Sequence, residues 1–175
     1  MKKHKSHKKH NKKRGFSLIE LLIVVAIILI IAAIAIPNLL RSRIAANEAS
    51  AVGSLHTINT AEVTYSTTYP NVGFACNLPT LGPPASGTSA SSSTAGLIDA
   101  NLANGVKSGY DFAVLSGNCA PANGIKTGYD YGAIPISPGV TGQRYFCTDL
   151  SGVIQYSQTA AFTDNSGVCS AGTPI

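Results

Sequence analysis

The fold of this chain is decided by the stretch RGFSLIELLIVVAIILIIAAIAIP, residues 14–37. From Phe16 to Ile36 it is apolar for 21 residues, interrupted only by the polar side chains of Ser17 and Glu20. A helix needs about 20 residues to cross the hydrocarbon core of a bilayer, so this length fits a membrane span. A carboxylate inside such a span costs roughly 2.5–3.5 kcal/mol on insertion scales. Glu20 therefore indicates a partner charge nearby, either in the membrane or in an assembly drawn out of it.

Glycine, phenylalanine and glutamate lie in this stretch at the offsets of a known processing site. The segment KKRGFSLIELLIVVAI resembles the N-terminal segment of type IV pilins and of the pseudopilins of type II secretion. The resemblance implies that a prepilin peptidase cuts after Gly15 and that the new N-terminal residue, Phe16, is N-methylated. It also implies that Glu20 is the assembly residue. The resemblance covers the leader and the N-terminal helix, so the remainder of the chain is interpreted on its own.

The basic character of the chain belongs to its leader, residues 1–15. The formal net charge is +5, and eight of the 13 lysines and arginines lie in residues 2–14. Cleavage after Gly15 would leave five basic residues against eight acids, a formal charge of −3. The leader charges are expected to hold the N-terminus on the cytoplasmic side. No nucleic-acid binding is expected of the mature chain, because that binding depends on neutralising phosphates with lysine and arginine.

Other interpretations of the N-terminus fit less well. The apolar run is longer than the 7–15 residues of a secretory signal, and no A-x-A-like cleavage site follows it. An uncleaved signal anchor is the serious alternative, but an anchor gains nothing from the carboxylate of Glu20. His4, His7 and His10 are spaced by threes in the leader, and histidine-rich tracts can bind metals. Because this segment is short, highly charged and expected to be removed, we interpret it as a solvated basic tail.

An apolar pattern resumes after Pro37. Its spacing of three and four residues predicts an amphipathic helix. The stripe consists of Leu40, Ile44, Ala51, Leu55, Ile58, Tyr65 and Tyr69. Pro37 removes one backbone hydrogen bond and is expected to kink the helix, and Pro70 is expected to end it. We predict one helix over residues 16–69, with residues 16–36 in the membrane and residues 37–69 lying on a globular head.

Three charged residues of the second helical half keep open roles. Glu62 falls on the apolar stripe by angle, which fits either a partner in the head or a water-exposed edge of the stripe. Arg41 and Arg43 follow the membrane exit. They are placed to pair with acids of neighbouring subunits, to contact lipid head groups, or to remain solvated.

Residues 70–108 are rich in Gly, Pro, Ser and Thr, which predicts an irregular connection rather than a packed element. The serine-rich part, residues 86–94, is typical of a flexible surface loop. Residues 97–103 are compatible with a short helix that has no strong caps.

Residues 109–175 carry strand patterns. Tyr110, Phe112 and Val114 alternate, Asn123-Gly124 is a candidate tight turn, and Tyr129 and Tyr131 alternate around Asp130. Pro135 would end that strand at an edge. Residues 144–156 suggest strand, turn and strand, and successive short strands predict an antiparallel meander. The fold class is therefore α+β, with a long N-terminal helix, its first half membrane-embedded, packed on a small antiparallel β-sheet head. This is also the pilin fold that the resemblance implies.

Four cysteines follow the membrane segment: Cys76, Cys119, Cys147 and Cys169. They are expected on the side of the membrane opposite the basic leader. That compartment is oxidising, so disulfides are expected. Four cysteines allow three pairings, and the sequence does not choose among them. We prefer Cys76–Cys119 and Cys147–Cys169, the second of which resembles the C-terminal disulfide loop of many pilins.

No metal site and no cofactor are predicted. A zinc site of four thiolates would lack the C-x-x-C spacing that such sites use. The D-N-S-G sequence at residues 164–167 offers oxygen ligands but not EF-hand spacing, so we interpret it as a turn.

No enzyme is predicted either. His56 is the one histidine left after cleavage, and the chain has no G-x-S-x-G elbow and no phosphate-binding loop. The resemblance implies a structural subunit of a type IV pilus. Its precursor would span the inner membrane once, with the leader in the cytoplasm and the head outside, and would later reach the cell surface in the pilus.

The partners implied are further copies of the chain, related minor pilins, the peptidase and methylase, an assembly platform in the inner membrane, and lipid. A pseudopilin of a type II secretion system is the alternative within this class. A single-pass anchored enzyme or binding module is the alternative from a different class. Adhesion, twitching, DNA uptake and secretion stay open among the roles.

Overall fold

The computed structural model describes residues 15–115, 119, 121–159, 162, 169 and 172–175. The basic leader with its three histidines and the predicted turn at residues 164–167 lie outside these residues. The chain divides into two compact units, Met1–Leu39 and Leu40–Ile175. The second unit is called the head below, and each unit is described by itself.

The first element is the α-helix α1, Leu18–Thr68. The predicted helix over residues 16–69 is confirmed to within two residues at either end. Its sequence is rich in Ala, Leu and Ile, and α1 continues through Pro37 without interruption. At the C-terminal end, the N–H of Tyr69 still donates to Tyr65 O (2.8 Å), and Pro70 follows directly. Proline disfavours the helical conformation of the residue before it, which explains the end of α1.

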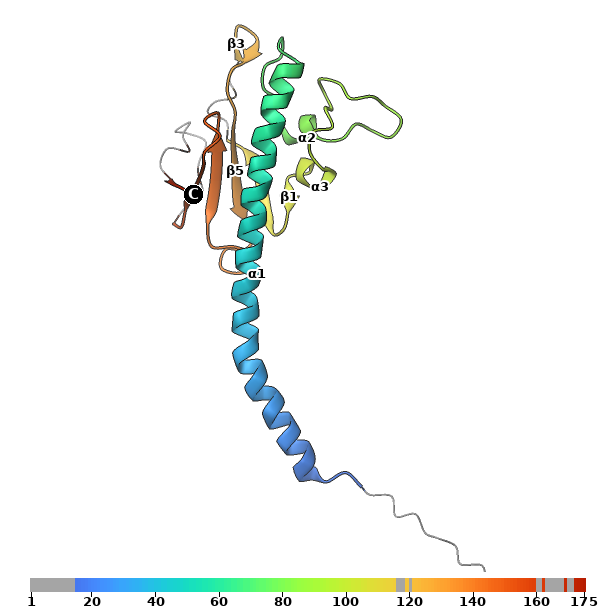
Figure 1. Ribbon diagram of the computed structural model, residues 1–175, viewed down its shortest axis with the longest axis vertical. Helices are drawn as coiled ribbons and strands as arrows, with labels where there is room; N and C mark the ends of the chain where they lie inside the picture. The colour runs from blue at the N-terminus through green and yellow to red at the C-terminus, as the bar shows by residue number, and fades with distance from the viewer. Residues whose placement is uncertain (1–14, 116–118, 120, 160–161, 163–168, 170–171) are drawn as a thin grey trace, which may run out of the picture. The chain divides into compact units, whose positions relative to one another are not determined.

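The head contains a six-stranded antiparallel sheet in the order β1-β2-β5-β6-β7-β8 (Figure 1). Its strands are β1 Val106–Lys107, β2 Tyr110–Val114, β5 Asp130–Pro135, β6 Tyr145–Asp149, β7 Ile154–Ser157 and β8 Thr173–Pro174. Neighbours in the sheet follow one another along the chain, which confirms the predicted meander. Pro135 ends β5 beyond the last residue that pairs with β6, so the proline leaves that side of the sheet intact.

A small hairpin is inserted between β2 and β5. Its strands are β3, Pro121–Ala122, and β4, Ile125–Lys126. Asn123 and Gly124 form the turn with positive φ angles of 52° and 82°. Positive φ at both central residues is what a type I′ turn requires, and Asn-Gly is its preferred sequence. The predicted tight turn is therefore confirmed.

The core of the head lies between the second half of α1 and one face of the sheet (Figure 1). From α1 it takes Ala51, Leu55, Ile58, Ala61 and Tyr65, and from the strands it takes Tyr110, Phe112, Tyr131, Ala133 and Phe146. Leu40 and Tyr69 of the predicted stripe are not buried. Leu40 is 43% exposed because it precedes Ile44, the first buried side chain of α1.

The connecting region has little regular structure, as predicted, but it contributes side chains to this core, which contradicts the expectation that it is not packed. It contains two four-residue helices, α2 Leu78–Leu81 and α3 Ala100–Ala103. Leu78, Leu81, Ile98 and Leu102 from this region are buried in the same core as α1. The short helix considered for residues 97–103 is present as α3, but the expectation that it lacks a strong cap was wrong. The side chain of Asp99 accepts hydrogen bonds from the N–H groups of Asn101 and Leu102 (both 3.1 Å), as an N-cap residue does.

Candidate functional site

The bond predicted to be cleaved lies in an open segment ahead of α1. Gly15 and Phe16 belong to no helix or strand. The Phe16 side chain is 79% exposed. A β-carbon added to Gly15 would meet nothing within 4 Å. None of the described residues therefore obstructs access to Gly15.

Glu20 lies in the first turn of α1, where it caps the helix. The backbone N–H of Ser17 donates to Glu20 Oε2 at 2.9 Å. Ser17 O in turn accepts from the N–H groups of Glu20 (3.1 Å) and Leu21 (3.3 Å). A side chain at the third helical position that reaches back to the N-cap N–H is one half of a capping box. This role was not predicted, although the S-x-x-E spacing of residues 17–20 is the sequence pattern of a capping box.

The apolar run of α1 is not buried by any of the residues that the structure describes. Among the described residues, α1 is the one helix long and apolar enough to cross a membrane, with a mean hydropathy of 3.3 over its most apolar 18 residues. None of that window is buried. Large side chains along it, including Leu22, Ile28 and Ile34, are each more than half exposed. A surface of this kind needs lipid or other helices around it.

Charged residues further along α1 fall into two groups. Arg41 and Arg43 are exposed and make no ion pair within the described part of the chain. Glu48 and Glu62 are buried, at 6% and 0% exposure. The open question about Glu62 is thereby answered in favour of a partner in the head.

Glu62 connects α1 to two other segments of the head. It accepts hydrogen bonds from the N–H of Ala75 (2.7 Å), the N–H of Cys76 (2.9 Å) and the hydroxyl of Tyr131 (2.6 Å). Lys126 donates to Ala75 O at 2.8 Å, which places a positive charge close by. Burial raises the pKa of Glu62 above its ordinary value, although its hydrogen bonds and Lys126 act in the opposite direction. Burial and the neighbouring carboxylate raise the pKa of Tyr131 well above its ordinary value, so its hydroxyl stays a donor.

Glu48 makes the second connection between α1 and the sheet. It accepts from the N–H groups of Gln143 (2.8 Å) and Arg144 (3.1 Å) and forms an ion pair with Arg144 Nε (2.8 Å). The guanidinium of Arg144 also lies 5.3 Å from the ring centres of Phe146 and Tyr156. The sequence analysis did not find Glu48, because its partner lies 96 residues away in the chain.

Both disulfides in the structure have the preferred pairing, Cys76 with Cys119 and Cys147 with Cys169. The Cα atoms are 5.8 Å and 5.6 Å apart, within the range that unstrained disulfides show. Cys76–Cys119 joins the start of the connecting region, shortly after the end of α1, to the segment that precedes β3. Cys147–Cys169 joins β6 to the C-terminal segment.

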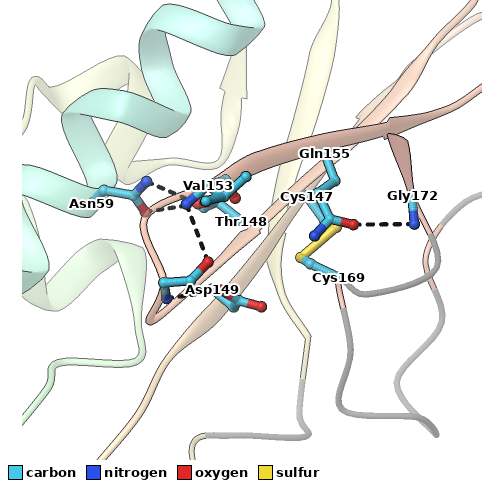
Figure 2. The surroundings of a disulfide bond; sticks show 9 residues. Asn59, Cys147, Thr148, Asp149, Val153, Gln155, Cys169 and Gly172 are labelled. Atoms are coloured by element: carbon cyan, nitrogen blue, oxygen red, sulfur yellow. Dashed lines mark hydrogen bonds between the residues drawn. A yellow bond between two sulfur atoms is a disulfide. The ribbon is translucent and has the colours of Figure 1, made fainter. Parts of the chain in front are cut away.

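Figure 2 shows the second disulfide, which links Cys147 of β6 to Cys169. Thr148 exchanges hydrogen bonds with the Asn59 side chain of α1 (2.8 Å and 3.0 Å). Its neighbour Cys147 points to the opposite face, because side chains alternate along a strand. There Cys147 and Cys169 are buried together with Leu115, as a small second cluster. The absence of a side chain at Gly132 makes room for it, since a β-carbon there would lie 3.2 Å from Leu115.

No group of three or more metal-ligating side chains occurs among the described residues. The predicted functional residues thus fall into two sets, one in each of the two units. Gly15, Phe16 and Glu20 lie together at the start of α1 in the first unit. The cysteines lie in the head, where they stabilise segments that the sheet alone would not hold.

Comparison with known proteins gives one match. Residues 10–36 match the family model of the prokaryotic N-terminal methylation motif. This motif is the signature of type IV pilins and pseudopilins, which are structural subunits. The motif and the apolar helix fit a membrane-anchored precursor. No curated protein and no solved structure matches the chain.

Proposed function

We propose that this chain, a type IV pilin-like or pseudopilin protein by its methylation motif, is a structural subunit of a type IV pilus. The observation that carries the proposal is the start of α1. There an accessible Gly15–Phe16 bond, a carboxylate in the first turn and an apolar helix that no described residue covers follow one another directly. Each of these features has a use in a polymer, beyond the helix cap and the membrane anchor that they provide in a single subunit.

Processing would come first. A peptidase would cut after Gly15, which removes the basic leader and creates a positively charged amino group on Phe16. N-methylation of that group would follow. The mature chain would then remain in the membrane through its apolar helix until it is assembled.

Assembly would transfer the helix from lipid into a bundle of like helices. Lipid tails are as apolar as leucine, so van der Waals packing between helices, rather than exclusion of water, has to favour the bundle. The residues available for this packing are the exposed apolar side chains of residues 18–36. Exposed apolar side chains cover that whole stretch, so a subunit can be surrounded by several neighbours.

Glu20 would fix the position of each subunit. In the single chain its Oε2 accepts from the Ser17 N–H, and no bond to Oε1 is found in the described structure. The carboxylate can therefore receive the amino group of Phe16 from an adjacent subunit while it keeps its cap. Pairing the two charges leaves neither of them alone in an apolar core, where an unpaired charge is strongly unfavourable.

A pseudopilin of a type II secretion system is the second candidate. The sequence at residues 149–154, DLSGVI, resembles the sheet region of pseudopilins, and in the structure it forms the turn between β6 and β7. Two disulfides and an exposed serine-rich loop favour a subunit that is displayed outside the cell. Neighbouring genes for a pilus retraction motor, or for secretion components, would separate the two candidates.

The test is to determine the mature N-terminus by mass spectrometry and to image sheared surface material by electron microscopy. We expect a chain that begins with methylated Phe16, and we expect it in filaments. A chain recovered with residues 1–15 still attached, and only as monomers, would contradict the proposal and favour an anchored binding module.

A further inference from the structure

The two disulfides of the head differ in how deeply they are buried. Cys147 and Cys169 are 0% and 1% exposed, and they form the second cluster together with buried Leu115. Cys76 and Cys119 are both partly exposed and pack at the margin of the main core. A thiol that reduces a disulfide has to reach one of its sulfur atoms, so access governs the rate. The two disulfides should therefore differ in their reactivity towards a dissolved reductant.

The buried disulfide is protected by the sheet. Cys147 lies in the middle of β6, opposite Gly132 of β5 and Gln155 of β7. A reductant reaches this position only when the sheet opens, and core strands open with free energies that approach that of global unfolding. Reduction of Cys147–Cys169 is thus tied to the unfolding of the head.

Cys76 has a backbone conformation that needs restraint. Its φ of 53° lies in the left-handed region, which residues other than glycine seldom adopt. Two of the contacts that restrain it are the hydrogen bond from its N–H to Glu62 Oε1 (2.9 Å) and the disulfide to Cys119. Residues in such conformations cluster at switch regions. Opening the disulfide removes one of the two restraints.

The surroundings of the Cys76 sulfur suit a reduced thiol as well. Cys76 Sγ lies 3.1 Å from Gly128 O. In the disulfide this sulfur carries no proton to donate, whereas the thiol is a weak hydrogen-bond donor. An acceptor for the reduced side chain is therefore already in place. This favours Cys119 as the sulfur that is attacked and Cys76 as the leaving group.

Opening this disulfide leaves other bonds in place between the same segments. The β3–β4 hairpin follows Cys119, and it is also joined to the segment after α1. The N–H of Lys126 donates to Val72 O (3.0 Å), and the N–H of Phe74 donates to Lys126 O (3.1 Å). Lys126 Nζ donates to Ala75 O at 2.8 Å. The head should therefore keep its core when this one disulfide is open.

We propose that Cys76–Cys119 is a redox-sensitive restraint, which a dithiol reductant opens while Cys147–Cys169 stays closed. A thiolate of the reductant attacks the Cys119 sulfur, the sulfur–sulfur bond breaks, and Cys76 leaves as a thiolate that takes a proton from water. The second thiolate of the reductant then attacks its own sulfur in the mixed disulfide and releases Cys119, which is protonated in turn. The head gains two electrons and two protons, and the reductant is oxidised to a disulfide.

The opened state changes the contact between α1 and the connecting region. Once the disulfide is open, Cys76 can leave its left-handed conformation, which weakens the bond from its N–H to Glu62. The redox state of a partly exposed disulfide is thereby coupled to the buried carboxylate of α1. This proposal does not depend on filament assembly, so it can fail while the proposed function holds, and the reverse.

The test uses the full chain, purified in detergent with both disulfides formed. Folded protein is treated with increasing dithiothreitol and alkylated, and mass spectrometry identifies the labelled cysteines. We expect Cys76 and Cys119 to be labelled together, at least about ten-fold faster than the buried pair, because access limits the exchange. Labelling of Cys147 and Cys169 should follow the rate of global unfolding, measured in parallel by circular dichroism. Reduction of both disulfides at one rate, or of the buried one first, would overturn the proposal.

Leu115→Ala is the matched control for burial. Removing this side chain from the second cluster should speed the reduction of Cys147–Cys169 and leave that of Cys76–Cys119 unchanged. A wild-type rate for Cys147–Cys169 in the variant would contradict protection by the cluster.

Hydrogen exchange measured by NMR tests the coupling to Glu62. After selective reduction, the amide of Cys76 should exchange faster, while the amides of β5 and β6 keep their protection. An unchanged exchange rate at Cys76 would refute the coupling, and loss of protection throughout the sheet would show that this disulfide holds the whole head together.

Discussion

Glu62 is the single residue whose loss should destabilise the head most. Its side chain is fully buried and satisfies the N–H groups of Ala75 and Cys76 and the hydroxyl of Tyr131. Glu62→Ala would leave these donors without an acceptor, and each unsatisfied buried group costs about 1–3 kcal/mol. We expect the free energy of unfolding to fall by about 3–5 kcal/mol in denaturant titrations. Exposed Asp111 offers the control, since Asp111→Asn should change stability by less than about 0.5 kcal/mol.

The same carboxylate predicts a pH dependence of a particular sign. Glu62 lies outside the membrane segment, and burial raises its pKa in the folded chain above the ordinary value of 4.5. Between the ordinary and the raised value the folded chain keeps a proton that the unfolded chain has lost. Stability therefore falls as the pH rises through this window. Denaturation measured from pH 4 upward should show this fall, and in Glu62→Gln it should be absent. A rise in the difference between wild type and variant over the same window would contradict the assignment.

Glu20 has two separable roles, and a conservative substitution distinguishes them. Glutamine at this position can still accept from the Ser17 N–H, since glutamine serves in capping boxes as glutamate does. It cannot neutralise an amino group. We expect Glu20→Gln to be inserted and processed like the wild type but to yield few or no filaments, measured as sheared surface protein and by mature N-terminal mass. Wild-type filament yield would show that the residue acts through the helix cap alone.

At the scale of elements, α3 depends on a single side chain. Asp99 caps this four-residue helix through the N–H groups of Asn101 and Leu102 and forms an ion pair with Lys107 (2.9 Å). Replacing an N-cap aspartate by alanine typically costs about 1 kcal/mol, whereas an exposed ion pair contributes about 0–1 kcal/mol. Asp99→Ala should therefore reduce the free energy of unfolding by about 1 kcal/mol or slightly more. Lys107→Met removes the ion pair alone, so an equal loss in that variant would refute the capping role.

Helices and strands long enough to show a periodic spacing of apolar side chains could be predicted from the sequence. The apolar run and the stripe that follows it predicted α1, alternation predicted β2 and β5, and the strand–turn–strand pattern of residues 144–156 predicted β6 and β7. The helices α2 and α3 have four residues each, and β1, β3, β4 and β8 have two. Segments this short show no periodicity, so contacts with the core determine their structure. Leu81, for example, accepts from the N–H groups of Leu97 and Ile98, far along the same region.

The residues of the candidate site likewise divide into those that a local sequence motif identifies and those that only long-range contacts identify. Gly15, Phe16 and Glu20 could be identified because the whole motif lies within a few consecutive residues. Glu48 and Glu62, the two carboxylates that connect α1 to other segments of the head, could not be assigned roles from the sequence. Glu62 and Tyr131 are 69 residues apart, and Glu48 and Arg144 are 96 apart. Neither pair leaves a pattern in one sequence, because the contact exists only after the sheet has formed against the helix.

At the scale of the whole molecule, the two units carry separate tasks. The buried side chains of α1 begin at Ile44, and the apolar run before it contributes nothing to the core. Both disulfides and both buried carboxylate networks lie within Leu40–Ile175. The first unit is thus available for the membrane and polymer contacts proposed for it, while the second folds around its own core.

This division predicts that the head folds without the first unit. Residues 40–175, exported to an oxidising compartment, should be a soluble monomer with both disulfides and a cooperative unfolding transition. Removing the exposed apolar run takes away the surface that would otherwise drive association. Size-exclusion chromatography, disulfide mapping and near-UV circular dichroism would measure this. The same fragment with Glu62→Ala is the matched control and should unfold at lower denaturant concentration. A wild-type fragment that aggregates or lacks fixed tertiary structure would show that the apolar half of α1 stabilises the head, against what its burial pattern indicates.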